Sequence, residues 1–218
     1  ARYDLQELVD YIDWTPFFHT WELRGSFPKI FDHPEMGEHA QDLFNHASDM
    51  LLRIVEEKWF QPRAVIGLWP ANAVGDDIEV YTDESRTTVK TVLHGLRQQS
   101  AKSGNRPNSC LTDFIAPKDS GIPDWVGGFV VTAGAEVDRI AKEFEDKNDD
   151  YSAIMVKALA DRFAEAFAER MHERVRQEFW ACAPQEKLDD ETLIREKYTG
   201  IRPTPGYPAC PDHTAKRK

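Results

Sequence analysis

The segment from Gly200 to His213 constrains this chain more than any other, because four of its residues are prolines. Proline lacks an amide donor and fixes φ, so the segment can form neither a helix nor an inner strand. Gly206 lets another group approach the backbone, Arg202 offers a fork of donors and Tyr207 offers a flat ring. A stiff loop of this kind suits a small ligand with a carboxylate and an aromatic base. A proline-rich surface crossing between two elements is the alternative, and composition does not separate the two.

Composition and charge exclude several classes of protein. A chain of 218 residues with a net charge of −11 lacks the basic surface that nucleic acid requires. It has no apolar run of about 18 residues and no signal-peptide pattern, so we expect no membrane span and a cytoplasmic location. The three cysteines, Cys110, Cys182 and Cys210, are far apart and are expected to be reduced. Cys210 and His213 have no second Cys/His pair nearby, so no metal site is predicted.

Hydrophobic periodicity predicts an α+β fold, with helices packed on a twisted antiparallel sheet. We expect one domain over residues 1–218. Its parts are a helical region (1–60), a mainly stranded region (61–133), a second helical region (134–199), and a loop with a short tail (200–218). The expected helices cover residues 5–11, 34–59, 134–147 and 149–180, and a further helix follows Asp189 and ends near Tyr198. The expected strands cover residues 64–69, 78–81, 87–93 and 125–132, with a turn at 71–76 between the first two.

An aromatic group in the N-terminal region is predicted to anchor that region to the core, because it carries too much apolar area to stay in water. Its members are Trp14, Phe17, Phe18 and Trp21. Asp13 lies beside them. A carboxylate in this position either caps a turn or faces a polar ligand.

The helix expected over residues 149–180 is capped by Asp149 or Asp150, and it has an apolar stripe and an acidic flank. The stripe contains Ile154, Met155, Leu159, Phe163, Ala166, Phe167, Met171 and Val175. Asp161, Glu165 and Glu169 follow one another at intervals of four residues on the other flank, which is usually a solvated face.

Four ordered stretches resemble the activation domain of cobalamin-dependent methionine synthase. The most specific is R-x-x-x-G-Y-P-A-C-P-D-H at residues 202–213. The others are residues 11–18, residues 68–72 with 75–78, and residues 149–162. In that family the domain continues past the loop into a strand that also touches the ligand. The resemblance therefore implies that the C-terminal part of the domain is lacking here and that ligand binding is weaker than in the full domain.

The resemblance also implies a function. The family's domain binds S-adenosylmethionine and presents its methyl group for reductive methylation of oxidised cobalamin, which a neighbouring module holds. The electron comes from flavodoxin or another flavoprotein reductase, and the whole enzyme is a methyltransferase of methionine biosynthesis. No catalytic residue is expected, because the sulfonium methyl is already electrophilic and needs only to be positioned. By position in the family's motifs, the ligand-binding residues are Asp13, Glu165, Arg202, Thr204, Gly206 and Tyr207.

The resemblance assigns a role to each of these residues. Arg202 holds the ligand carboxylate, Tyr207 packs on the ligand, and the amides and carbonyls of residues 204–207 reach its polar groups. Asp13 and Glu165 accept hydrogen bonds from its amino group or its ribose hydroxyls, directly or through water. Two alternatives belong to other classes: a docking domain that caps the cobalamin module and brings in the reductase without binding a nucleotide, and an unrelated small-molecule binder.

Overall fold

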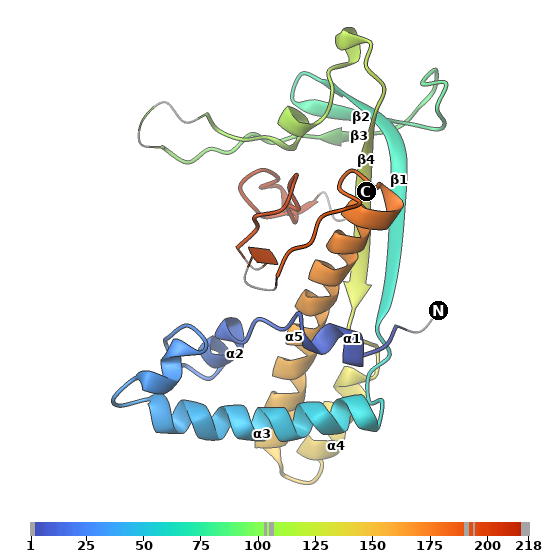
Figure 1. Ribbon diagram of the computed structural model, residues 1–218. Coiled ribbons are helices and arrows are strands. Elements are labelled where there is room, and N and C mark those ends of the chain that lie inside the picture. The colour runs from blue at the N-terminus through green and yellow to red at the C-terminus, as the bar shows by residue number, and fades with distance from the viewer. Residues whose placement is uncertain (1–2, 103, 105–106, 190–191, 194, 215–218) are drawn as a thin grey trace. The chain divides into compact units, whose positions relative to one another are not determined.

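A computed structural model describes residues 3–102, 104, 107–189, 192–193 and 195–214 (Figure 1). The chain forms two compact units. The first contains Ala1–Val65 and Val130–Thr199, and the second contains Ile66–Phe129 and Gly200–Lys218. The proline-rich loop therefore belongs to the same unit as most of the sheet, while the long helices form the other unit.

The first unit is helical. Among its elements, α5 is the longest, and Figure 1 shows it continuing directly into the π-helix η4. The side chain of Asp149 accepts a hydrogen bond from the amide of Ser152 at 3.0 Å, which confirms the predicted cap of α5. The elements are α1 (Gln6–Val9), α2 (Thr15–Thr20), the 3₁₀-helix η1 (Lys29–Asp32), α3 (Gly37–Glu56), α4 (Val137–Glu145), α5 (Asp150–Arg174) and η4 (Val175–Phe179).

Aromatic rings form much of the core of this unit. Phe17 and Phe18 are completely buried, as predicted, and Phe18 lies in a group of rings with Phe27, Phe31 and Phe44. Trp14 and Trp21 are only half-buried. Each still contacts a ring, since Trp14 meets Phe44 at 4.8 Å and Trp21 meets Tyr151 at 5.1 Å between centroids. The N-terminal region is thus anchored as expected, with the two phenylalanines innermost.

The periodicity of α5 was predicted correctly except at one position. Met155, Leu159, Phe163 and Phe167 are buried, whereas Ile154 is 47% exposed. The exposed residues of this helix form a row that advances by three or four residues at a time: Tyr151, Ile154, Lys157, Asp161 and Glu165. Ile154 belongs to this row and not to the core stripe. It was assigned to the core because its side chain is apolar.

The sheet has the strand order β3-β2-β1-β4. Its strands are β1 (Arg63–Val74), β2 (Asp77–Tyr81), β3 (Val89–His94) and β4 (Asp124–Thr132). Strand β2 pairs antiparallel with both β1 and β3. Two 3₁₀-helices, η2 (Leu111–Phe114) and η3 (Lys118–Ser120), lie between β3 and β4 in the chain. Together with the helices of the first unit, this sheet confirms the α+β class.

The predicted turn at residues 71–76 is wrong, because β1 continues to Val74. Ala71 pairs with Val80 and Val74 pairs with Asp77, so only Gly75 and Asp76 make the turn. Gly75 has φ of 62°, a left-handed conformation that glycine adopts readily. The strand extends this far because Ala71, Ile78 and Val80 form the buried core of the second unit, with Leu93, Leu111, Ile115 and Val126 packed against them.

Asn72, in one of the stretches that resemble the family, has a structural role. Its side chain is buried, and its amide donates to the carbonyls of Ala116 at 3.1 Å and Ile122 at 2.9 Å. Its carbonyl accepts from the Arg86 guanidinium at 3.1 Å. Arg86 also lies over the Trp125 ring, 5.0 Å from its centroid. Asn72 therefore fastens the segment between η2 and β4 to the edge of the core.

Within the part of the chain that the structure describes, none of the helices combines the length and apolarity that a bilayer span requires.

Candidate functional site

The proline-rich loop folds on itself through backbone hydrogen bonds. The amide of Tyr207 donates to the carbonyl of Thr204 at 2.9 Å, and the amide of Cys210 donates to the carbonyl of Tyr207 at 2.9 Å. The amide of Gly206 donates to the carbonyl of Cys210 at 2.7 Å. These bonds make two successive tight turns, so the loop holds its shape without belonging to a helix or a sheet. The amides of Gly206 and Tyr207 are used inside the loop.

Gly206 is required at its position for two reasons. Its φ is 110°, which side-chain-bearing residues rarely adopt. In addition, a Cβ atom placed on Gly206 would overlap the imidazole of His213, lying 2.7 Å from its Nε2 and 3.0 Å from its Nδ1. The space that glycine leaves open is therefore filled by a side chain from the same loop.

The other predicted ligand groups of the loop differ in exposure. Tyr207 is 55% exposed, so its ring is accessible to a partner, and Thr204 is also exposed. Arg202 is half-buried. A guanidinium, a hydroxyl and an accessible phenol ring within six residues of one rigid loop are suited to a ligand with a carboxylate and a flat base.

The surroundings of Cys210 disfavour its thiolate form. Burial and the nearby Asp212 carboxylate raise the pKa of its thiol above the ordinary value. Among the described residues, no group of three or more His, Cys, Asp or Glu side chains could hold a metal ion. The side chains of the loop offer hydrogen bonds, a charge and a ring contact to a ligand.

Asp13 and Glu165 lie in the first unit. Asp13 is half-buried and accepts a hydrogen bond from the amide of Thr15 at 2.9 Å, at the beginning of α2. The capping interpretation of this carboxylate thus has a direct observation behind it. Glu165 lies in the exposed row of α5. A ligand-binding role for either carboxylate stays a prediction, whereas Arg202, Thr204, Gly206 and Tyr207 lie together in the loop of the second unit.

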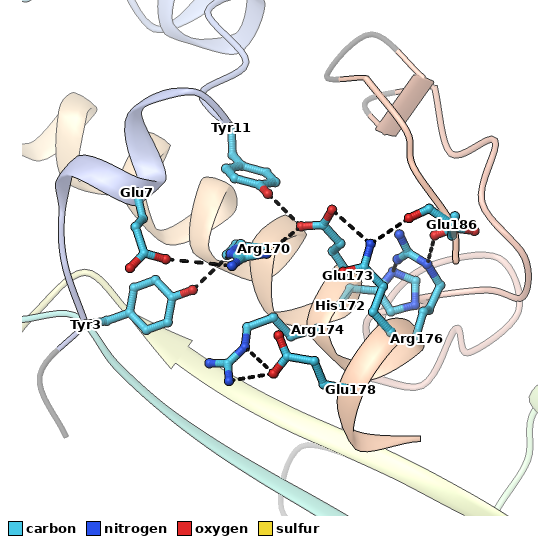
Figure 2. A network of polar contacts seen from close by, with 11 residues as sticks. Tyr3, Glu7, Tyr11, Arg170, His172, Glu173, Arg174, Arg176, Glu178 and Glu186 are labelled. Atoms are coloured by element: carbon cyan, nitrogen blue, oxygen red, sulfur yellow. Dashed lines mark hydrogen bonds and ion pairs between the residues drawn. The ribbon is translucent and has the colours of Figure 1, made fainter. Parts of the chain in front are cut away.

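The sequence did not reveal a polar network that ties the N-terminal segment to α5 (Figure 2). The Tyr11 hydroxyl donates to Glu173 at 2.6 Å, and Arg170 donates to the same carboxylate at 2.8 Å. Arg170 also donates to the Tyr3 hydroxyl at 3.1 Å and lies 3.7 Å from the Glu7 carboxylate. Burial and the Glu173 carboxylate raise the pKa of Tyr11 to about 12. No helical period links these residues, because Tyr3 and Tyr11 lie outside α1.

The network continues towards η4 around a buried cation. Arg176 is only 2% exposed and pairs with Glu186 at 2.6 Å. Its guanidinium, which can only donate, lies 2.8 Å from Nδ1 of His172. The guanidinium also lies over the Tyr198 ring, 4.5 Å from the centroid. This group joins the end of α5 to residues 186 and 198 and stabilises the first unit.

Comparisons with known proteins show the family and the fold of this chain. The family model described as "Vitamin B12 dependent methionine synthase, activation domain" matches residues 4–218. A solved structure of the MetH reactivation domain bound to AdoHcy is 57% identical in sequence and superposes with a TM-score of 0.93. The match covers 100% of this chain and 66% of the chain in that structure.

The AdoHcy in that structure shows that a protein with this fold and a closely related sequence binds an S-adenosyl ligand. A family match over nearly the whole length, at this level of identity, establishes both fold and membership. The chain belongs to the activation-domain family of vitamin B12-dependent methionine synthase.

Proposed function

We propose that this chain binds S-adenosylmethionine and presents its methyl group for the reductive methylation of an oxidised cobalamin held by a neighbouring module of a methionine synthase. The observation that carries the proposal is the self-supporting loop at residues 200–214 in a chain 57% identical to an AdoHcy-bound reactivation domain. AdoHcy is S-adenosylmethionine without its methyl group, so a site for one suits most of the other.

The groups of the loop fit the ligand. Arg202 would receive the carboxylate as a charge-assisted, two-pronged hydrogen bond. The accessible ring of Tyr207 would pack on the ligand, with the Thr204 hydroxyl as a further polar contact. Because the amides of Gly206 and Tyr207 already donate within the loop, the backbone would contribute carbonyl oxygens, which suit the ammonium and adenine amino groups.

Asp13 and Glu165 are proposed as additional carboxylate groups for the cationic amino end or the ribose hydroxyls. S-Adenosylmethionine carries a sulfonium and an ammonium against one carboxylate, so its net charge is positive. A chain with a net charge of −11 attracts such a ligand over a distance. The substitutions Asp13→Asn and Glu165→Gln each test one carboxylate without changing its size.

Binding and positioning are the tasks left to the protein. The sulfonium supplies an electrophilic methyl, and cobalamin supplies the nucleophilic metal once it is reduced. The residues of this chain have only to hold the methyl in line, which needs neither a general acid nor a general base. We further propose that flavodoxin or another flavoprotein reductase delivers the electron and that the reaction takes place in the cytoplasm.

Ligand protection of the thermal transition tests the proposal against a docking function without nucleotide binding. S-Adenosylmethionine is expected to raise the melting temperature in a concentration-dependent way, since it binds the folded state. Arg202→Ala is expected to reduce this protection, whereas the exposed control Arg139→Ala, in the other unit, is expected to keep it. Absence of protection at millimolar ligand in the parent chain would favour the docking function.

A further inference from the structure

The contact between His213 and Gly206 has a consequence for the ligand loop. We propose that His213 is a positioning residue, whose imidazole holds the turn at residues 204–207 in the shape that the ligand requires. This inference rests on the proposed function and adds a residue to it. His213 is not among the predicted ligand groups, and it acts through Gly206.

The geometry supports a specific fit. Ring atoms Nε2 and Nδ1 lie 2.7 Å and 3.0 Å from the point where a Cβ on Gly206 would stand, with Cε1 nearest of all. Such proximity means that the ring occupies the volume of the missing side chain. The absence of a side chain at Gly206 thus makes room for the His213 ring in this structure.

The backbone on both sides of His213 is fixed. Asp212 accepts a hydrogen bond from the amide of Thr214 at 2.8 Å and another from the Thr214 hydroxyl at 2.7 Å, closing a turn around His213. On the other side, Pro211 restricts φ and the Cys210 carbonyl accepts from the Gly206 amide at 2.7 Å. The loop is therefore closed twice, once by a backbone hydrogen bond and once by the ring.

Two closures have a predictable effect on binding. The turn carries Thr204 and Tyr207 and lies directly after Arg202, so its order fixes where these groups point. A loop that is ordered before the ligand arrives loses less conformational freedom on binding. Removing the ring should loosen the turn, and we expect a ligand affinity roughly tenfold weaker.

The test compares His213→Ala, His213→Phe and the exposed control His39→Ala. The first readout needs no ligand: hydrogen exchange at the amides of Gly206, Tyr207 and Cys210. His213→Ala is expected to accelerate this exchange about tenfold, and His213→Phe, which keeps a flat ring, is expected to restore it. The second readout is the dissociation constant for S-adenosylmethionine, which should follow the same order. The melting temperature should change little, because the effect is confined to one loop.

A double variant tests the ring contact itself. Gly206→Ala should disturb the turn through both its φ and its overlap with the ring. In His213→Ala/Gly206→Ala the overlap is gone, so the combined loss should be smaller than the product of the two single losses. Multiplicative losses would overturn the inference.

The outcomes separate this inference from the proposed function. Unchanged exchange in His213→Ala, or tighter ligand binding by it, would refute the positioning role while leaving the proposed function intact. The positioning role is also refuted if His213→Phe leaves the amide exchange rates or the dissociation constant at the values of His213→Ala. A parent chain that does not bind S-adenosylmethionine, but whose exchange responds as expected, would refute the proposed function and support the packing of His213 on Gly206.

Discussion

The pair Arg176–Glu186 gives the sharpest test of how the helical unit is stabilised. The side chains are 2% and 10% exposed, and their charged atoms are 2.6 Å apart. Glu186→Gln keeps the size of the side chain and an oxygen that can accept from Arg176, but it removes the charge. A buried cation is then left without its counter-charge, which costs about 3–5 kcal/mol when a partner is removed entirely.

We expect the lower end of that range, about 3 kcal/mol, because the amide oxygen can still accept a hydrogen bond. A matched control pair lies close by in the chain. Arg174 and Glu178 are 2.7 Å apart but 28% and 46% exposed, so Glu178→Gln should cost less than about 0.5 kcal/mol. The same chemical change in two environments isolates the effect of burial.

The assay is urea unfolding followed by circular dichroism at a helix-sensitive wavelength, which reports mainly on the first unit. With a slope of about 2 kcal/mol per molar urea, Glu186→Gln should lower the midpoint by about 1.5 M, and Glu178→Gln by about 0.2 M. Equal midpoints for the two variants would refute the argument. The double variant Arg176→Met/Glu186→Leu should recover most of the loss, because it removes both charges.

Two further predictions concern other parts of the chain. Asn72→Ala should destabilise the second unit by about 2–3 kcal/mol, because it removes the donor to the Ile122 carbonyl and the acceptor of Arg86, and leaves the Ala116 carbonyl with only the Ala73 amide. The exposed control Asn45→Ala should cost under about 0.5 kcal/mol, and chemical denaturation of both variants decides this. The pKa of Tyr11 is raised from 10.0 to about 12 in the folded state, chiefly by burial and then by Glu173. Its contribution to stability is therefore complete below pH 10 and is lost as the pH rises towards 12, because the unfolded chain ionises first. Tyr11→Phe should flatten that part of a stability-versus-pH curve, and an unchanged curve would count against the Glu173 contact.

Local rules predicted those parts of the fold that depend on neighbours in the sequence. The cap at Asp149 and the stripe from Met155 to Phe167 follow from helical periodicity and side-chain chemistry. The turn after β1 was predicted to begin at residue 71, whereas β1 stays paired as far as Val74. Tertiary contacts decide otherwise, since Asn72 is buried and bonded to a segment more than forty residues away.

In the candidate site as well, features set by the local sequence were predicted and features set by tertiary contacts were not. The stiffness of the loop follows from its prolines, and its two turns agree with that expectation. The sequence did not show that His213 fills the space beside Gly206, because this depends on the path of the chain between them. Arg176 lies in η4, and its partners are His172 of α5, Glu186 and Tyr198. Because these residues do not share one helical period, no single sequence pattern predicts the cluster.

A calorimetric titration of S-adenosylmethionine into this chain, its Arg202→Ala variant and its Arg139→Ala control tests the central claim most directly. Loss of a charge-assisted hydrogen bond of about 1.5–3 kcal/mol corresponds to a dissociation constant raised roughly 10- to 150-fold. We predict saturable binding to the parent and to Arg139→Ala, and binding weakened by that factor in Arg202→Ala. Equal affinity of Arg202→Ala and the parent would contradict the claim that this loop holds the ligand carboxylate.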